Sequence, residues 1–352
     1  MPLKVIAEHR EPQPGSNAIT VAAAQLGGPW LKPAARLARI IEAAHVAAAS
    51  GATLIAYPET YLSGYPFWPS RTQGALFDHP DQKDCYAYYL DAAIEVDGPE
   101  QREMQIAAAD LGITMIVGVT ERGRGLGRGT AWCTLLTLDP RHGLVGHHRK
   151  LVPTYDERLV WGQGDGAGLV THPVGPALVG SLNCWENWMP QARTALYAQG
   201  ETVHVAAWPG SSALTGDITR FVAAEGRVFG IAASGLITAD SIPSDFPLAD
   251  QLREASDTVV FDGGSAIAGP DGRWVIPPVV GEEGVIVADL DLDHVFRERL
   301  NFDPTGHYTR PDVFSTVVNR ARNEAVRFTT DERLRDGRTT EDSLEQELRA
   351  YP

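Results

Sequence analysis

Three residues that could take part in chemistry each follow an apolar run of the chain. Glu59 comes directly after TLIAYP, Lys150 after LVGHHR, and Cys184 after ALVGSLN. A thiolate can attack an electrophilic carbon, a carboxylate can take up the thiol proton and later activate water, and an ammonium can stabilise negative charge on oxygen or nitrogen. Side chains of these three kinds, brought together, would form a covalent hydrolase.

The backbone around Cys184 is expected to assist such chemistry. We expect a strand to end at Cys184 and a helix to follow closely, and the positive end of a helix dipole favours a thiolate. The next backbone amides would point at the same place. They could stabilise an anion that develops on a substrate, as oxyanion-hole donors do.

Each of these residues, taken singly, also has an ordinary structural explanation. A cysteine at the end of an apolar strand is most often a small buried hydrophobic residue, which is our interpretation of Cys85 and Cys133. A single Glu or Lys beside a strand is usually a solvated edge residue. Spacing along the chain therefore does not select the triad by itself.

The elements that must position these residues alternate along most of the chain. Apolar runs typical of strands alternate with segments of helical periodicity, and the helices thin out near residue 257. The predicted strands are 19–26, 53–59, 113–119, two within 131–150, 176–184, 202–209, a hairpin over 258–275 and 284–292, and the predicted helices are 34–50, 99–110, 189–200 and 219–233. We therefore expect one α/β domain, with a mixed sheet and helices outside.

Composition and charge exclude several classes of partner. The chain has 352 residues and a formal net charge of −15, which would repel a phosphate backbone and argues against nucleic acid. No apolar segment is long enough for a membrane span, and the N-terminus lacks the apolar stretch of a signal peptide. The three cysteines are expected to be reduced. We interpret the chain as a cytoplasmic protein that binds a small molecule.

We expect no metal ion and no cofactor. His147 and His148 would project from opposite faces of a strand and cannot share one ion. Asp289, Asp291 and Asp293 would line one face of another strand. We interpret that face as solvated or as part of an interface.

Three motifs together favour the hypothesis that Glu59, Lys150 and Cys184 act as a catalytic triad. YPETYLSGYP surrounds Glu59, HRKLVPTYDERLVWGQGDG surrounds Lys150, and NCWENWMP surrounds Cys184. These motifs closely resemble the nitrilase branch of the carbon-nitrogen hydrolase superfamily. The similarity continues through GSAIAGPDG, GEEGVIVADLDLD and FDPTGHYTRPDVFS, so it covers about residues 18–318.

The resemblance implies a role for each matching residue. Glu59 would be the general base, Lys150 the cationic stabiliser and Cys184 the nucleophile. Glu157, in TYDER, matches the family's second glutamate, which supports the lysine and helps to position the substrate.

The resemblance also implies the architecture and the assembly. The fold would be a four-layer α-β-β-α sandwich, and subunits would pair through helices beside the active site, often growing into spiral oligomers. We predict an N-terminal extension over residues 1–17, the hydrolase domain over 18–318 and a charged C-terminal tail over 319–352. This tail could serve as an oligomer-interface arm and contains one predicted short helix, TEDSLEQEL.

The reaction implied is the hydrolysis of a nitrile to a carboxylic acid and ammonia through a thioimidate and a thioester on Cys184, with some amide as a by-product. Tyr65, Trp185, Trp188 and Trp208 lie in or near the motifs and could line an aromatic pocket, which weakly favours aryl or arylaliphatic nitriles. The alternative for these aromatic residues is core or subunit-interface packing.

Other functions compatible with the same triad remain open. An amidase or carbamoyl-type hydrolase would attack an amide carbon, and a cyanide-degrading enzyme would share these motifs. The sequences CWENWMP and PETYLSGYP look closer to nitrilases than to the amidase branches. A non-catalytic scaffold would have no need of Glu59, Lys150, Glu157 and Cys184 together.

Overall fold

The computed structural model describes residues 2–10, 17–124 and 127–323. The described residues up to Ala321 form one compact unit. Its described strands form two seven-stranded sheets, both of them mixed. The first sheet runs, in spatial order, β1 (Val5–His9), β14 (Gly284–Asp291), β2 (Ala18–Gln25), β3 (Leu54–Ala56), β4 (Thr114–Arg122), β5 (Ala131–Asp139) and β6 (Gly143–Arg149).

The second sheet is formed by strands from the later part of the chain. Its strands β8, β9 and β10 are parallel, whereas β12 is antiparallel to β10. The spatial order is β11 (Leu236–Thr238), β12 (Val259–Ala268), β10 (Phe229–Ser234), β9 (Val203–Trp208), β8 (Ala177–Asn183) and β7 (His172–Val174), with β13 (Trp274–Val280) paired to β12.

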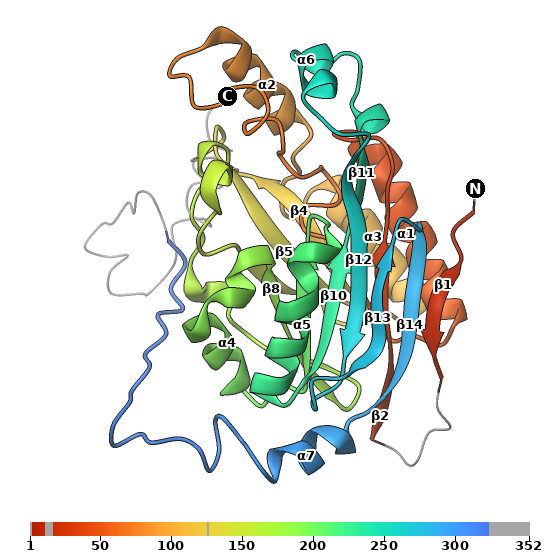
Figure 1. The fold of residues 1–352 in the computed structure, drawn as a ribbon, viewed down its shortest axis with the longest axis vertical. Coiled ribbons are helices and arrows are strands. Elements are labelled where there is room, and N and C mark those ends of the chain that lie inside the picture. The colour runs from red at the N-terminus through yellow and green to blue at the C-terminus, as the bar shows by residue number, and fades with distance from the viewer. Residues whose placement is uncertain (1, 11–16, 125–126, 324–352) are drawn as a thin grey trace, which may run out of the picture. The chain divides into compact units, whose positions relative to one another are not determined.

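Helices cover the outer face of each sheet (Figure 1). The α-helices are α1 (Pro33–Ala49), α2 (Pro80–Asp91), α3 (Pro99–Leu111), α4 (Pro190–Tyr197), α5 (Ser212–Gly226), α6 (Ala249–Glu254) and α7 (Asp293–Arg299). The 3₁₀ turns are η1 (Tyr155–Leu159), η2 (Gly166–Gly168), η3 (Cys184–Trp188) and η4 (Ala239–Ser241). Proline occupies the first turn of α1 through α4, where its missing N–H costs nothing.

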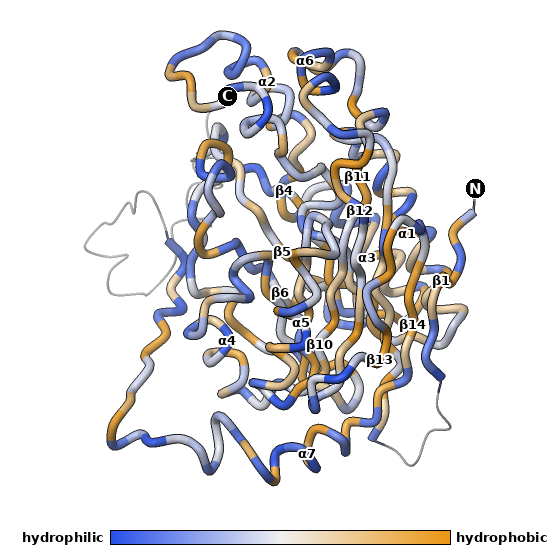
Figure 2. Tube along the Cα trace, viewed as in Figure 1, coloured by the Kyte–Doolittle hydropathy of each residue, from blue (hydrophilic) through white to orange (hydrophobic). Residues whose placement is uncertain are grey.

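Side chains alternate between two cores along the strands. Val21 of β2 packs with Val205 of β9 in the core between the two sheets. Its neighbour Ala22 faces the other way, toward Ile40 of α1 and Met104 of α3. Apolar residues accordingly gather along the central strands (Figure 2). The predicted four-layer α-β-β-α sandwich is confirmed.

The predicted helix over 219–233 is wrong in its second half. α5 ends at Gly226, Arg227 adopts a left-handed φ of 50°, and β10 begins at Phe229. β10 lies between β9 and β12 and pairs with both. The sheet therefore determines the conformation of this segment, and local periodicity does not reveal it.

The two ends of the chain add further observations. The segment 1–17, predicted as an extension, includes β1, which pairs in parallel with β14. From residue 324 onward the predicted tail lies outside the described residues, and so does its predicted short helix over 340–348. Among the described residues, no helix combines the length and the apolar character needed to cross a membrane.

Candidate active site

The turn after β8 presents the predicted nucleophile. β8 ends at Asn183, and Cys184 begins η3 with a left-handed φ of 48°. A non-glycine residue in this region is uncommon and strained, and such residues cluster at functional sites. The side-chain amide of Asn187 donates to the Cys184 carbonyl at 2.8 Å and fastens the turn. Cys184 is buried.

The predicted base is held between the two sheets. Glu59 follows β3 of the first sheet, and its backbone N–H donates to the carbonyl of Trp208, the last residue of β9, at 3.1 Å. Gly118 of β4 lies directly against this turn. A Cβ at Gly118 would come within 2.1 Å of the Pro58 carbonyl oxygen, so only glycine allows β4 to approach so closely.

Lys150 joins two glutamates. Its Nζ donates to Oε1 of Glu59 at 2.8 Å and to Oε2 of Glu157 at 2.7 Å, and all three side chains are buried. Oε1 of Glu157 accepts a third hydrogen bond, from the Tyr65 hydroxyl at 2.8 Å. The lysine follows β6 and Glu157 lies in η1, so residues that are far apart in sequence from Glu59 converge on it.

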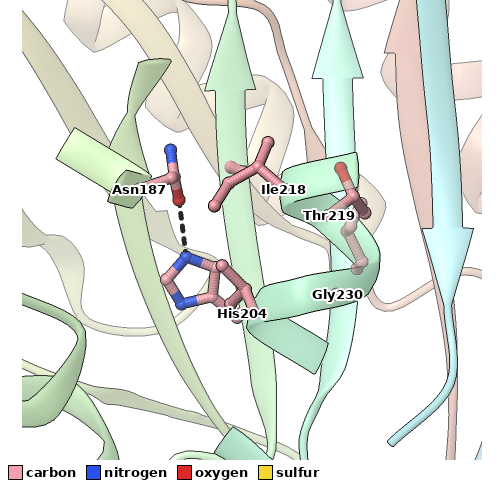
Figure 3. Close-up of a pocket in the computed structure, with 8 residues that line it drawn as sticks. Asn187, His204, Ile218, Thr219 and Gly230 are labelled. Carbon is pink, nitrogen blue, oxygen red and sulfur yellow. Dashed lines mark hydrogen bonds between the residues drawn. The ribbon is translucent and has the colours of Figure 1, made fainter. Parts of the chain in front are cut away.

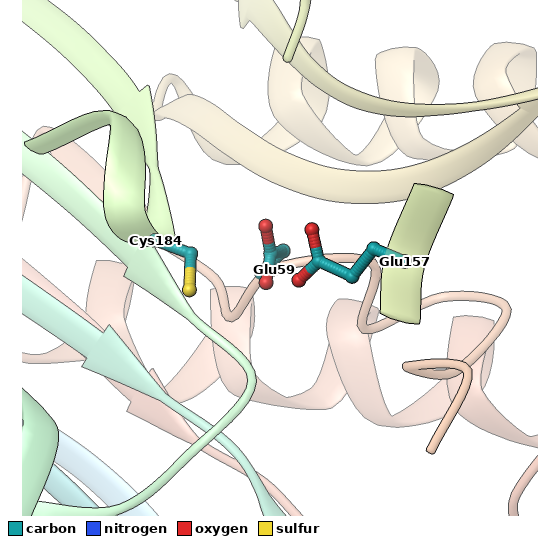
Figure 4. A group of neighbouring side chains, drawn as sticks. All are labelled: Glu59, Glu157 and Cys184. Atoms are coloured by element: carbon teal, nitrogen blue, oxygen red, sulfur yellow. The ribbon is translucent and has the colours of Figure 1, made fainter. Parts of the chain in front are cut away.

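Cys184 lies beside this ion cluster. Single ligand-type atoms of Glu59, Glu157 and Cys184 all lie within 4.8 Å of one another. In Figure 4 Glu59 lies between Cys184 and Glu157, and the carboxylate of Glu157 extends toward it. The structure therefore brings Glu59, Lys150, Glu157 and Cys184 into one site, although the sequence separates them widely.

Burial controls the protonation of this site. Desolvation raises the pKa of Glu59 to about 7, against the opposing effect of Lys150, and the charge of Glu157 adds to the rise. Desolvation acts to lower the pKa of Lys150, but the surrounding negative charges, Glu59 foremost, outweigh it and raise that pKa well above its usual value. Lys150 is therefore a permanent cation, and Glu59 is poised to exchange a proton near neutral pH.

The expected thiolate of Cys184 is not what the site favours at rest. Burial, followed by the charge of Glu59, raises the pKa of the Cys184 thiol well above its ordinary value. η3 spans only Cys184–Trp188, and the hydrogen bond from the Trp185 amide is outweighed by desolvation and the neighbouring carboxylates. The prediction from the helix dipole is wrong because it ignored both. Cys184 is a neutral thiol that needs a base.

A carbon-nitrogen hydrolase model matches residues 20–297. The chain belongs to the carbon-nitrogen hydrolase family. Curated relatives include a nitrilase of Bradyrhizobium diazoefficiens, 36% identical over 84% of this chain and 89% of that protein. An arylacetonitrilase of Trametes versicolor is 35% identical over 75% of this chain and 85% of that protein. The chain is a nitrilase-like carbon-nitrogen hydrolase.

A solved structure shows the same fold. The amidase from Nesterenkonia AN1, solved as a cysteine-to-alanine mutant, matches this carbon-nitrogen hydrolase with a TM-score of 0.58. The sequence identity is 20%, and the match covers 82% of this chain and 97% of that chain. This likeness supports the layered architecture.

The predicted aromatic residues of this hydrolase lie in different environments. Tyr65 contacts the ion cluster, with its hydroxyl on Glu157 and its ring edge-on to Trp161 and Phe261. Trp208 is buried in the core beneath α5. Trp185 and Trp188 remain 46% and 43% exposed.

The ligand atoms of Glu59, Glu157 and Cys184 also form a set that could hold a metal ion by composition. Lys150 Nζ, however, lies within hydrogen-bonding distance of both carboxylates. Its ammonium would repel a cation placed there. In this cluster the positive charge between the two carboxylates is therefore supplied by Lys150.

Sequence reasoning missed a buried carboxylate that ties two catalytic-site turns together. Glu186 accepts from the backbone N–H of Asn183 at 2.9 Å and from that of Leu151 at 2.6 Å. Its third partner is His148 Nε2, at 3.0 Å. Glu186 therefore fastens the turn of Cys184 to the turn of Lys150. Its position three residues after Asn183, at the start of a helical turn, is the capping-box signal that could have revealed it.

Glu186→Gln should destabilise the protein by about 3 kcal/mol and lower kcat, because a neutral amide loses the charge of the carboxylate and turns an NH2 donor toward one of the backbone N–H groups that Glu186 accepts. Urea unfolding and initial rates would measure both effects. The matched control is Glu103→Gln on the exposed face of α3. Equal unfolding midpoints for the two variants would contradict the role of Glu186 in joining the two turns.

A second buried chain of hydrogen bonds also reaches the nucleophile turn. Asn187 uses its amide nitrogen on Cys184, so its Oδ1 accepts from His204 Nε2 at 2.8 Å (Figure 3). His204 Nδ1 in turn faces Glu201 at 2.9 Å. The small cavity drawn in Figure 3 adjoins this chain, and its lining includes none of the four clustered residues. We interpret this region as support for the turn.

Proposed function

We propose that this chain is a nitrilase that hydrolyses an organic nitrile to the carboxylic acid and ammonia. The observation that carries the proposal is the buried contact of Lys150 with Glu59 and Glu157 beside the Cys184 thiol. Relatives named as nitrilases, from a bacterium and from a plant, support the nitrile as substrate. No metal or cofactor enters this mechanism.

The first step forms a carbon–sulfur bond. Glu59 accepts the proton of the neutral Cys184 thiol while the sulfur attacks the nitrile carbon. Negative charge develops on the nitrile nitrogen, which Lys150 and the Trp185 amide stabilise. The nitrogen then takes up the proton that Glu59 received from the thiol, and Glu59 is ionised again. The product of this step is a covalent thioimidate.

Two waters complete the reaction. Glu59 deprotonates the first water, which adds to the thioimidate carbon to give a tetrahedral intermediate. Glu59 passes both protons of this water, one after the other, to the nitrogen. Ammonia then leaves, and a thioester remains on Cys184. A second water, activated in the same way, releases the acid and returns the proton to the thiol. If the tetrahedral intermediate expels sulfur instead of ammonia, the product is the amide.

The finer substrate class proposed is an aryl or arylaliphatic nitrile, as a weak preference. A relative named as an arylacetonitrilase supports it. The small cavity beside Glu59 has a largely apolar wall that includes two tyrosines. The residues lining this pocket are Leu26, Arg36, Pro58, Glu59, Tyr61, Tyr65, Pro209, Gly235, Leu236 and Ile237. Of the four aromatic residues predicted to contact substrate, Tyr65 is part of this wall.

The test is ammonia release and product mass for arylacetonitriles, aromatic nitriles, aliphatic nitriles, cyanide and the matched amides. Acid formed from nitriles and not from amides would support the proposal, with kcat/KM highest for aryl or arylaliphatic compounds. Turnover of amides alone would move the assignment to the amidase branch. Turnover of cyanide alone would move it to cyanide degradation.

We also propose that the chain self-associates into dimers and larger spirals through the surface beside the active site. Trp185, Trp188 and Phe221 form a half-exposed aromatic row on η3 and α5. An exposed apolar row of this kind is typical of protein interfaces. Trp188→Glu should reduce the mass measured by light scattering. An unchanged mass would contradict an interface at this row.

A further inference from the structure

A second buried thiol contacts the predicted base. Cys133 lies in β5 with 1% of its surface exposed, and its Sγ is 3.3 Å from Oε1 of Glu59. The backbone carbonyl of the same residue accepts the N–H of Lys150 at 2.8 Å. Cys133 therefore contacts both Glu59 and Lys150, the two charged residues on which the proposed chemistry depends.

The direction of the Cys133–Glu59 hydrogen bond follows from burial and charge. Desolvation, followed by the negative charge of Glu59, raises the pKa of the Cys133 thiol well above its usual value, so the sulfur keeps its hydrogen. An ionised carboxylate is an acceptor only. The thiol of Cys133 must therefore donate to Oε1 of Glu59.

The two oxygens of Glu59 consequently differ. Oε1 accepts from the Lys150 ammonium at 2.8 Å and from the Cys133 thiol at 3.3 Å. Oε2 is buried and has no hydrogen-bond partner within the described part of the chain. A buried, unpaired carboxylate oxygen is costly, and it is the atom best placed to gain a proton.

We propose that Cys133 is a positioning residue for the hydrolysis: with Lys150, it holds Oε1 of Glu59 so that Oε2 takes the proton from Cys184 and then from water. This inference rests on the proposed function, because it requires Glu59 to act as the general base. It gives Cys133 a role distinct from that of a nucleophile, since the buried neutral thiol only donates a hydrogen bond.

Other titratable groups also face Glu59. They are Lys150, Glu157, Cys184, Tyr65 and Tyr89, and they come from different turns, from η3 and from α2. Replacement of Cys133 leaves all of these groups in place. A shift in the titration of Glu59 would then report the lost thiol donor.

The test compares three substitutions at Cys133 by the pH dependence of kcat/KM. Cys133→Ala and Cys133→Val both remove the donor. Alanine leaves a small cavity and valine adds bulk, so a shift shared by the two variants reports the lost hydrogen bond and not the packing. Both should move the acid limb upward by about half to one pH unit, because the ionised form of Glu59 loses a hydrogen bond. Cys133→Ser keeps a donor on a shorter bond, so its limb should fall between those of the wild type and Cys133→Val.

Cys85→Ala is the matched control. Cys85 is a buried thiol of α2 that packs in a core with Trp68 and Phe246 and has no contact with Glu59. Its pH profile should equal that of the wild type. Equal wild-type and Cys133→Val profiles would overturn the positioning role, and so would opposite shifts in the alanine and valine variants.

A second measurement needs no nitrile turnover. The rate at which iodoacetamide alkylates Cys184, followed by peptide mass at each pH, also depends on proton transfer to Glu59. The acid limb of this rate should shift in Cys133→Val as it does in turnover. A shifted alkylation limb without nitrile hydrolysis would uphold Cys133 and overturn the nitrilase assignment. An unshifted alkylation limb beside intact nitrile hydrolysis would overturn the role of Cys133 alone.

Discussion

Replacement of Cys184 by alanine should lower kcat by at least about 10⁴-fold, because every covalent step runs through its sulfur. The fold should persist, because the turn is held by groups other than the thiol. Asn187 donates to the backbone carbonyl of Cys184, and Glu186 accepts the N–H of Asn183. Ammonia release would measure the loss. Intact mass after rapid quenching should show a substrate adduct in the wild type and none in the variant.

The control for this experiment is Cys85→Ala, which removes another buried thiol, one influenced by Leu248, Asp81 and Asp84 and not by the ion cluster. It should retain full turnover. Circular dichroism and thermal melting would confirm that both variants fold. Ammonia release by Cys184→Ala at the wild-type rate would refute the thiol mechanism.

Replacement of Glu59 by glutamine should lower kcat by about 10²–10⁴-fold, because the amide cannot accept the thiol proton. The pH profile makes this prediction specific. Burial raises the pKa of Glu59 to about 7, and the reactive form is the carboxylate. Wild-type kcat/KM should therefore be high above pH 7 and fall about tenfold per unit as the pH drops below it.

The residual activity of Glu59→Gln should lack this acid limb, since the titrating group is gone. Rates across pH 5 to 9 for the wild type and the variant would decide this. Glu103→Gln, on the exposed face of α3, makes the same chemical change away from the site and should keep the limb. A limb near pH 7 that persists in Glu59→Gln would assign the base to another residue.

The sequence by itself indicated most elements of the fold, and the resemblance of its motifs to a known family indicated their layers. Local periodicity gave the positions of most strands and helices, because the alternation of apolar residues reflects which face of an element is buried. Leu37 and Ile40 recur at helical spacing and face the first sheet in α1. The same reasoning failed at β10, because its two neighbouring strands are distant in sequence.

The sequence also indicated the residues of the site but not their physical state. Motif resemblance singled out Glu59, Lys150, Glu157 and Cys184, since a family's motifs record residue types at fixed positions. Whether Cys184 is ionised depends on desolvation and on charges brought close by two packed sheets. No local pattern contains that information.

The second layer of contacts was decided by tertiary structure alone. Cys133 was interpreted from sequence as a buried hydrophobic residue, and it is indeed buried. Its contact with Glu59 joins residues 74 positions apart, and Glu186 joins the turns of Lys150 and Cys184. Hydrogen bonds of this kind depend on distances that the packing of whole sheets sets to within a fraction of an ångström. Residue type and spacing determine which groups are available, and only the folded chain determines which of them meet.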